Sequence, residues 1–157
     1  MPTIRQYDDA CDRAQVVDLW ISVFGYEAAH NEPSLSIAKK LAVNDGLFFV
    51  ATQGGTVVGT VMAGYDGHRG SLNSVAVHPA MRGSGLGSEL VRHAEAALSA
   101  LGCMKINLLL LSTNAATAAF YTSLGYVVEP RLSMGRVLHE NVPLGGAADS
   151  VTGSTEC

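Results

Sequence analysis

The chain has 157 residues, a formal net charge of −4 at neutral pH, 48% apolar residues and 15% charged residues. This length predicts one domain with a sizeable core, and the acidic balance without a basic run argues against nucleic acid as the main partner. No window of about eighteen apolar residues occurs and no basic-then-apolar leader precedes the first predicted element, so we expect a cytoplasmic protein without a membrane span.

The first half of the chain alternates apolar periodic segments with turn signals. Asp8 or Asp9 can cap a first helix, because a short side-chain oxygen satisfies the free N–H groups there. Residues 53–55, Gln-Gly-Gly, lie between two β-branched runs and indicate a hairpin. The elements expected in this half are a strand at Thr3–Tyr7, a helix from Asp8 or Asp9 to about Phe24, a helix from Pro33 or Ser34 to about Val43, and strands at Leu47–Thr52, Thr56–Ala63 and Leu72–His78.

The most informative motif begins within the last of these strands, at residues 75–87. The sequence Val-Ala-Val-His-Pro-Ala-Met-Arg-Gly-Ser-Gly-Leu-Gly places Gly83, Gly85 and Gly87 at alternate positions, where a helix begins. These residues have no Cβ and leave backbone N–H groups accessible, while the helix N-terminus adds a partial positive charge. The motif therefore predicts a cradle for a phosphate or pyrophosphate, to which Arg82 can add a charged fork.

Three phosphate-binding patterns can be compared with this loop. A P-loop requires Lys followed by Ser or Thr after its last glycine, whereas Ser and Glu follow here. A dinucleotide fingerprint requires Gly-x-Gly-x-x-Gly and an acid about twenty residues later, whereas residues 103–107 contain no acid. The third pattern, Arg/Gln-x-x-Gly-x-Gly/Ala after a strand ending in Val-x-Pro, fits as Arg82-x-x-Gly85-x-Gly87. A glycine-rich turn without a ligand is the structural alternative.

Further elements follow the loop. A helix over Gly85–Leu101 has the clearest apolar stripe of the chain and ends at Gly102. Lys105–Leu111 is apolar almost throughout and predicts a strand covered on both faces. Strand, helix and strand then form a parallel βαβ unit, which is right-handed by strong precedent. Tyr126–Glu129 and Leu132–Leu138 predict two closing strands.

A second motif lies at residues 114–126, Asn-Ala-Ala-Thr-Ala-Ala-Phe-Tyr-Thr-Ser-Leu-Gly-Tyr. Asn114 occupies a helix N-cap position, and Ala118, Tyr121 and Leu124 follow at helical spacing. Gly125 marks the end of this helix. The structural alternative for Tyr121 is a core aromatic residue whose hydroxyl has a hydrogen-bond partner.

Together, in this order and separated by a helix and a strand, the two motifs resemble the signatures of the GNAT superfamily of N-acetyltransferases. The resemblance covers most of residues 3–138, and residues 64–70 resemble small single-domain bacterial members. It implies an α/β (α+β) GNAT fold, with a central mixed, mostly antiparallel sheet and a splayed parallel βαβ pair flanked by helices. We expect a GNAT acetyltransferase domain at residues 1–140 and a mobile tail at residues 141–157, which lack periodicity.

In this family, acetyl-CoA lies in the V between the splayed strands, and an amine attacks its thioester directly. The resemblance makes Tyr121 the general acid, and a backbone N–H at Val75 or Val77 can stabilise the developing oxyanion. Gly85 and Gly87 tolerate no Cβ in this arrangement, because it would crowd the phosphates. The implied coenzyme-binding residues are Val75, Ala76, Val77, Arg82, Gly83, Ser84, Gly85, Leu86, Gly87, Ser88 and Asn114.

The general base and the acceptor stay open. The ribosomal-protein alanine acetyltransferases of this superfamily carry a Glu five residues before the Asn, where this chain has Leu109. The candidate bases are Glu27, His30, Asp66 and His68. A small amine or an amino-sugar is the first candidate acceptor, and a protein N-terminus or lysine is the second. The candidate substrate-binding residues are Tyr26, Glu27, His30, Tyr65 and Asp66.

Two function classes follow from these motifs. The first is an acetyl-CoA-dependent N-acetyltransferase, which the presence of both Tyr121 and Asn114 favours. The second is a non-catalytic GNAT-like sensor that binds acyl-CoA without turnover. The expected partners are acetyl-CoA and an amine acceptor, without nucleic acid or membrane, and a homodimer is compatible with the fold. No metal is expected, because the three cysteines show no zinc-type or redox spacing.

Overall fold

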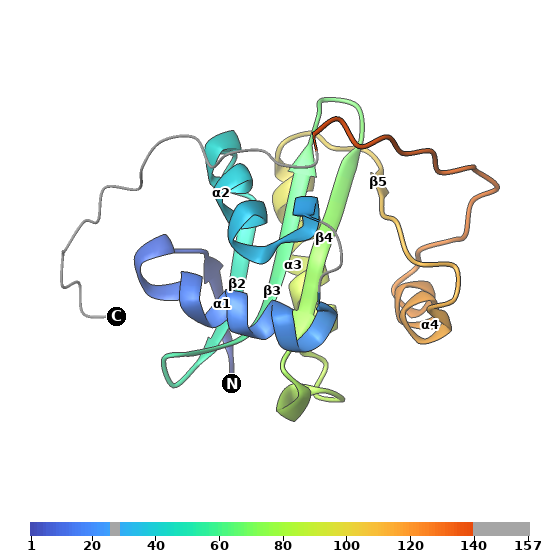
Figure 1. The fold of residues 1–157 in the computed structure, drawn as a ribbon. Coiled ribbons are helices and arrows are strands. Elements are labelled where there is room, and N and C mark those ends of the chain that lie inside the picture. Colours follow the sequence, from blue (N-terminus) through green and yellow to red (C-terminus); the bar gives the residue numbers. More distant parts are fainter. Residues whose placement is uncertain (26–28, 140–157) are drawn as a thin grey trace.

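A sheet with helices on both faces organises the computed structural model, which describes residues 1–25 and 29–139 (Figure 1). The strands follow one another in the order β1-β2-β3-β4-β5, so each strand lies beside its neighbours in the chain. Pairing is antiparallel from β1 to β4 and parallel between β4 and β5. The strands of the described part are β1 (Thr3–Gln6), β2 (Phe48–Gln53), β3 (Thr56–Tyr65), β4 (Gly70–Val77) and β5 (Ile106–Asn107).

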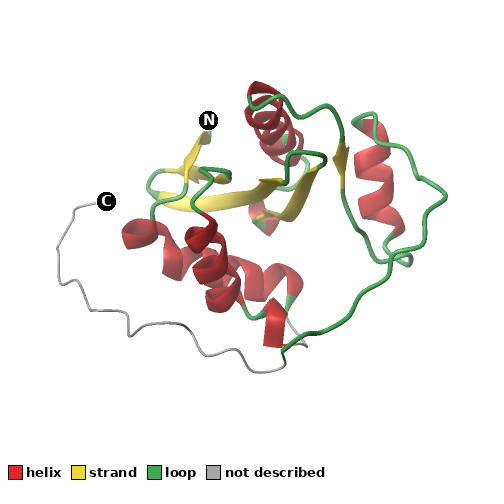
Figure 2. Ribbon diagram, turned by 90° about the horizontal axis from the view of Figure 1, so that it is seen from above, coloured by secondary structure: helices red, strands yellow, loops and turns green. Residues whose placement is uncertain are grey.

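The helices divide between the two sides of this sheet. Helices α1 and α2 pack on one face and α3 packs on the other, so the sheet lies between them when viewed from above (Figure 2). Helix α4 stands beyond β5, at the end of the sheet where β4 and β5 diverge (Figure 1). The helices are α1 (Asp9–Phe24), α2 (Pro33–Val43), α3 (Leu86–Ala100) and α4 (Ala115–Ser123), with short 3-10 turns η1 (Ala29–Asn31) and η2 (Pro79–Met81).

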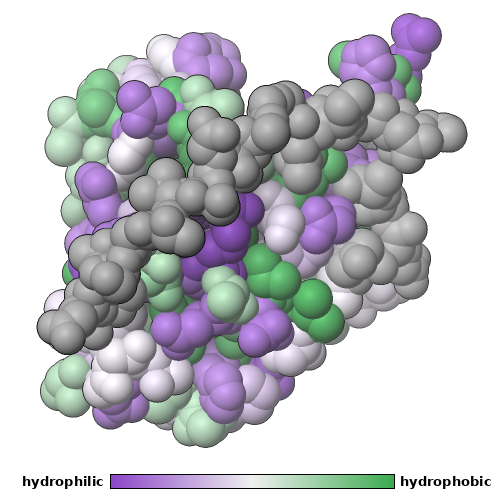
Figure 3. All heavy atoms as spheres, turned by 60° about the vertical axis from the view of Figure 1, so that its left-hand side comes forward, coloured by the Kyte–Doolittle hydropathy of each residue, from purple (hydrophilic) through white to green (hydrophobic). Residues whose placement is uncertain are grey.

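Two apolar clusters hold these layers together. Along β2, Phe48 and Val50 pack toward α1 and α2, whereas Phe49 and Ala51 pack toward α3, as the period of two in a strand requires. Each fully buried side chain such as Leu90 contributes about 1.5–3 kcal/mol to folding. On the outer side viewed in Figure 3, hydrophilic and hydrophobic residues are interspersed, as expected for a face formed by amphipathic elements.

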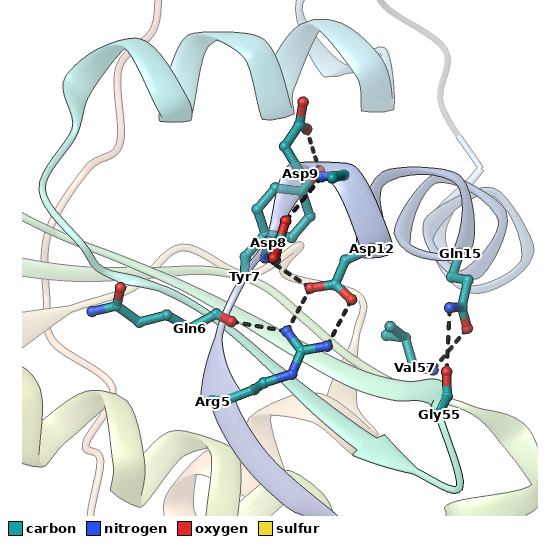
Figure 4. A network of polar contacts seen from close by, with 10 residues as sticks. Arg5, Gln6, Tyr7, Asp8, Asp9, Asp12, Gln15, Gly55 and Val57 are labelled. Carbon is teal, nitrogen blue, oxygen red and sulfur yellow. Dashed lines mark hydrogen bonds and ion pairs between the residues drawn. The ribbon is translucent and has the colours of Figure 1, made fainter. Parts of the chain in front are cut away.

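A polar network ties the first strand to α1 (Figure 4). The Arg5 guanidinium donates to both carboxylate oxygens of Asp12, at 2.7 and 2.9 Å, and Asp12 is only 1% exposed. The Asp12 carboxylate also accepts from the backbone N–H of Asp8 at 2.8 Å. Asp8 caps α1 by accepting from the N–H of Ala10 at 3.0 Å, which confirms one of the two predicted caps.

Strand β4, helix α3 and strand β5 form the predicted parallel βαβ unit. The two strands pair only at Gly70 with Ile106 and at Ser71 with Asn107, and they diverge beyond these positions (Figure 1). The mixed, mostly antiparallel sheet with a splayed parallel pair is therefore confirmed. This divergence opens a space that residues of both sequence motifs line.

The prediction of a long strand over Lys105–Leu111 was wrong. Strand β5 spans only Ile106–Asn107, and the side chains of Leu109 and Leu111 are 80% and 78% exposed. Apolar composition predicts a covered strand only where a neighbour continues the ladder. Because β4 separates from this segment after Ser71, residues 108–111 have no ladder partner on that side.

The two predicted closing strands, Tyr126–Glu129 and Leu132–Leu138, are also absent. The first segment lies beside β5 through side chains: the Glu129 carboxylate accepts from Lys105 Nζ at 2.8 Å and from Asn107 Nδ2 at 2.7 Å. No backbone ladder joins it to β5 in the part of the chain that the structure describes. A strand needs a partner edge, and a strand of two residues offers too little edge to align another.

Residues 141–157, predicted to be a mobile tail, lie outside the described residues, so the domain boundary near residue 140 stays a prediction. Among the helices described, none is both long and apolar enough to cross a bilayer.

Candidate active site

A cavity of about 830 Å³ opens where β4 and β5 diverge. Its walls come from the end of α1, the second half of β4, the loop before α3, residues 108–111 and helix α4. Volumes of roughly 300–1,000 Å³ are typical of small-molecule sites. Tyr121 and all of the predicted coenzyme-binding residues line this cavity except Ala76 and Ser84. The two sequence motifs, which are about thirty residues apart, thus meet in one space.

The glycine-rich loop forms one end of this cavity. Gly83 and Gly85 have φ angles of +77° and +86°, which residues with a Cβ rarely adopt. A Cβ built on either residue would meet no atom within 4 Å, so open space lies in front of both. Gly85 is the N-cap of α3 and provides no side-chain cap. The first N–H groups of this helix are therefore available to an anion.

Gly87 lines the cavity and also allows close packing between two helices. A Cβ at this position would lie 3.3 Å from the Phe120 ring and 3.6 Å from a methyl group of Val77. The absence of a side chain thus lets α4 approach the start of α3. This contact brings Tyr121, the next residue of α4, to the wall of the cavity.

Tyr121 lies on α4, whose ends follow the predicted signals. Asn114 caps the helix by accepting from the N–H of Thr117 at 3.2 Å. The Tyr121 side chain is 6% exposed and makes edge contacts with the rings of Phe120 and Tyr126, with centroids 5.0 and 5.5 Å away. Burial raises the pKa of Tyr121 to about 12, so its hydroxyl is protonated at neutral pH.

Strand β4 carries a β-bulge at the cavity wall. The β3–β4 pairing shifts between Thr60 with Ala76 and Met62 with Asn73, so β4 holds one residue more than β3 in this interval. Ser74, within the bulge, has a φ of +51° although it is not glycine. Asn73, Ser74 and the next residue all line the cavity. The sequence shows no signal for this bulge, because no glycine marks it.

Two of the predicted substrate-binding residues do not line the cavity: Tyr65 ends strand β3, and Asp66 begins the turn that follows. The Tyr65 hydroxyl donates to a backbone carbonyl of the same turn at 3.2 Å. The Asp66 carboxylate accepts from the N–H groups of Arg69 and His68, both at 2.7 Å. These backbone hydrogen bonds lower the pKa of Asp66, because they stabilise its charged form.

Part of the cavity wall is apolar. Val23 and Phe24, at the end of α1, and Leu111 line it, and none of the three is among the residues predicted from the sequence. No lining residue in the described ranges carries a carboxylate or an imidazole. His30 lies in η1 outside the lining, and the remaining candidates, Tyr26 and Glu27, lie outside the described residues.

Comparison with known proteins agrees with this geometry. The chain matches the model of the acetyltransferase (GNAT) family over residues 13–126. An acetyltransferase from Yersinia pestis (strain Pestoides F) is 41% identical over 108 residues, which cover 69% of this chain and 77% of the relative. The chain therefore belongs to the GNAT family of acetyltransferases and is an enzyme of the N-acetyltransferase class.

Two solved structures illustrate the shared fold. The ribosomal-protein-S18-alanine N-acetyltransferase from Escherichia coli has a TM-score of 0.64 and 26% identity, with 80% of this chain and 77% of that chain covered. The PaiA N-acetyltransferase from Thermoplasma acidophilum, solved in complex with coenzyme A, has a TM-score of 0.71 and 17% identity, with coverage of 82% and 91%. At that identity the second likeness concerns the fold alone.

Proposed function

We propose that this chain is an acetyl-CoA-dependent N-acetyltransferase that transfers the acetyl group to a primary amine by direct attack. The observation that carries the proposal is the meeting of both motifs in one cavity. The glycine-rich loop lies at one end, the free edge of β4 forms a wall, and Tyr121 reaches in from α4. An anion cradle can bind the pyrophosphate of acetyl-CoA, an extended backbone can pair with its pantetheine arm, and a proton donor can protonate the departing sulfur.

The chain's residues fit this coenzyme. Gly83 and Gly85 leave the loop N–H groups uncovered for the pyrophosphate, and Arg82 adds charge at the same end. The backbone of β4 beyond Ser71 has no ladder partner on the cavity side, so it can pair with the amides of a pantetheine arm as an added strand would. The Asn114 side-chain NH2 group can donate to the same arm. Acetyl-CoA supplies an activated thioester there.

Groups of the chain then stabilise charge and donate a proton. The backbone N–H of Val75 or Val77 donates to the developing oxyanion. Tyr121 donates its hydroxyl proton toward the departing sulfur. Because the pKa of Tyr121 is about 12 and that of a thiol is about 8.5, we assign Tyr121 a modest contribution, at the lower end of the ~10²–10⁴-fold of general acids.

We assign the acceptor as a small amine or an amino-sugar, with a protein N-terminus or lysine as the second candidate. Leu109, at the position of the expected Glu, is exposed and lines the cavity, which supports an acceptor other than the ribosomal-protein alanine of the E. coli relative. Without an acid in the described lining, the base is reached through water or through residues outside the described ranges. Tyr121 in the cavity favours turnover over the sensor alternative.

Titration calorimetry with acetyl-CoA, followed by assay of free thiol release across a panel of amines, tests this proposal. Micromolar binding and thiol release with one amine class are the expected results. The matched panel contains small amines, amino-sugars, a peptide with a free N-terminus and a peptide with a free lysine. Absence of acetyl-CoA binding would overturn the proposal, and binding without release from any of these amines would favour the sensor.

A further inference from the structure

A buried chain of hydrogen bonds leads from α1 to the bulge of β4. Trp20 Nε1 donates to Thr60 Oγ1 at 2.8 Å, and Thr60 Oγ1 donates to the carbonyl oxygen of Ser74 at 2.8 Å. Trp20 is 3% exposed and Thr60 is fully buried. An indole N–H only donates and a carbonyl only accepts, so the direction of the hydroxyl proton between them is determined.

This chain of hydrogen bonds holds a backbone conformation that would otherwise be unfavourable. Ser74 has a φ of +51°, in the left-handed region that residues with a Cβ seldom occupy. Such conformations persist only where the surroundings hold them, and they concentrate at functional sites. The β3–β4 ladder is interrupted at the bulge, and the Ser74 carbonyl accepts a hydrogen bond from the Thr60 hydroxyl there.

The same contact determines where the next N–H points. In a trans peptide, the C=O and the N–H that share one plane point in opposite directions. The carbonyl of Ser74 points toward the Thr60 hydroxyl, so the N–H of Val75 points away from that hydroxyl. Val75 is also one of the residues that line the cavity.

We propose that Trp20 and Thr60 are positioning residues that hold the Ser74–Val75 peptide so that the Val75 N–H faces the thioester carbonyl of bound acetyl-CoA. The inference rests on the proposed function and selects Val75 from the two candidate oxyanion donors. Neither Trp20 nor Thr60 lines the cavity, so neither touches the ligand. Both act through the peptide that they hold.

Packing alone would not require these two polar groups. Trp20 belongs to an apolar cluster that also contains Val50 and Val57, and a valine in place of Thr60 would fill nearly the same volume without a hydroxyl. A buried hydroxyl is tolerated only when it is hydrogen-bonded. The acceptor of this hydroxyl is the bulge carbonyl, so the buried pair serves the geometry of the bulge.

Three variants and one control separate positioning from stability. Thr60→Val removes both hydrogen bonds at nearly constant volume, Thr60→Ser keeps the hydroxyl, and Trp20→Phe removes the indole donor together with part of the buried ring. The control is Gln15→Leu, since Gln15 also joins α1 to β3, by accepting from the Val57 N–H at 2.9 Å, but lies outside this chain of hydrogen bonds. Acetyl-CoA affinity is measured by calorimetry for all of them.

The informative readout is the infrared stretch of ¹³C-labelled acetyl thioester bound to each variant, which needs no acceptor amine. A hydrogen bond from the Val75 N–H lowers the frequency of this stretch. We expect Thr60→Val to return it toward the frequency of free acetyl-CoA, and to lower kcat by about 10–100-fold while the KM for acetyl-CoA is unchanged, because a misdirected donor retains part of its ~10²–10³-fold effect. We expect Thr60→Ser to retain the stretching frequency and the kcat of the unchanged protein. Trp20→Phe should give intermediate values, and Gln15→Leu should change neither quantity.

Each outcome decides the matter. A Thr60→Val protein with a lower melting temperature but an unchanged stretch and kcat would overturn the inference. If Thr60→Val does not fold, the Trp20→Phe protein decides: a shifted stretch supports positioning, and an unshifted one overturns it. Failure of the unchanged protein to bind acetyl-CoA would show separately that the proposed function is wrong, and the inference would fall with it.

Discussion

Tyr121 is buried on α4 and also lines the cavity. The contribution of its ring to packing and that of its hydroxyl to catalysis can therefore be tested separately. Tyr121→Phe keeps the ring contacts with Phe120 and Tyr126 and removes only the hydroxyl. We expect kcat to fall about 10–100-fold, at the lower end of general-acid effects, while the affinity for acetyl-CoA is unchanged. Steady-state kinetics and calorimetry check this. Lost affinity with normal turnover per bound enzyme would make Tyr121 a packing residue.

The ionisation of Tyr121 and Tyr126 should make the free energy of unfolding depend on pH. Burial raises the pKa of both Tyr121 and Tyr126 to about 12, above the ordinary value of 10.0. The folded state therefore holds these protons more tightly than the unfolded chain does. Their contribution is complete below pH 10 and is lost as the pH rises toward 12. Urea unfolding across this range should show a decline that is smaller in Tyr121→Phe, and an equal decline would contradict it.

Arg5 offers a test of the buried carboxylate of Asp12. Arg5→Met leaves Asp12 buried without its cation, and because Arg5 is partly exposed we expect a loss of about 1–3 kcal/mol rather than the ~3–5 of a fully buried pair. Arg13→Met is the matched control, since its ion pair with Asp9 is exposed on both sides and should contribute less than about 1 kcal/mol. Equal losses in urea unfolding would refute the distinction.

Among the elements, the loop before α3 is where a single substitution should remove the coenzyme. Gly85→Glu forces a side chain into a φ of +86° and adds a negative charge beside the anion cradle. Calorimetry should show acetyl-CoA affinity reduced roughly 100-fold or more. Gly85→Ala introduces the backbone strain without the charge, so its affinity for acetyl-CoA should lie between those of the unchanged protein and Gly85→Glu. Unchanged affinity in Gly85→Glu would exclude the loop as the phosphate site.

The elements also show what a single sequence can predict. Helices α1, α2 and α3 begin and end within a residue or two of their predicted limits, because caps and apolar periodicity are local signals. The loop that lines the cavity was also predicted from a local signal, the glycines at alternate positions before α3. The short β5 and the absent closing strands were not, since pairing depends on whether a distant edge arrives. The Ser74 bulge and the reach of Phe24 into the cavity likewise depend on tertiary packing.

At the scale of the whole molecule, the segment that carries Tyr121 is joined to the sheet by few backbone contacts. Two residue pairs link β4 to β5, whereas β3 pairs with its neighbours along most of its length. We expect the amides of β5 and α4 to exchange with solvent faster than those of β2 and β3. Saturating acetyl-CoA should slow the α4 amides, by up to about 100-fold at a concentration 100 times Kd. Equal exchange with and without coenzyme would contradict this.

Strands β4 and β5 are joined by two residue pairs, and this short pairing has a consequence for the regulation of the enzyme. Under the proposed function, coenzyme that contacts both the glycine-rich loop and α4 would also fix the position of Tyr121, so coenzyme occupancy and Tyr121 alignment would be linked. Free coenzyme A, which lacks the acetyl group, would bind in the same way. The fraction of enzyme that carries acetyl-CoA would then depend on the ratio of acetyl-CoA to free coenzyme A, and turnover would follow this ratio as well as the acceptor concentration.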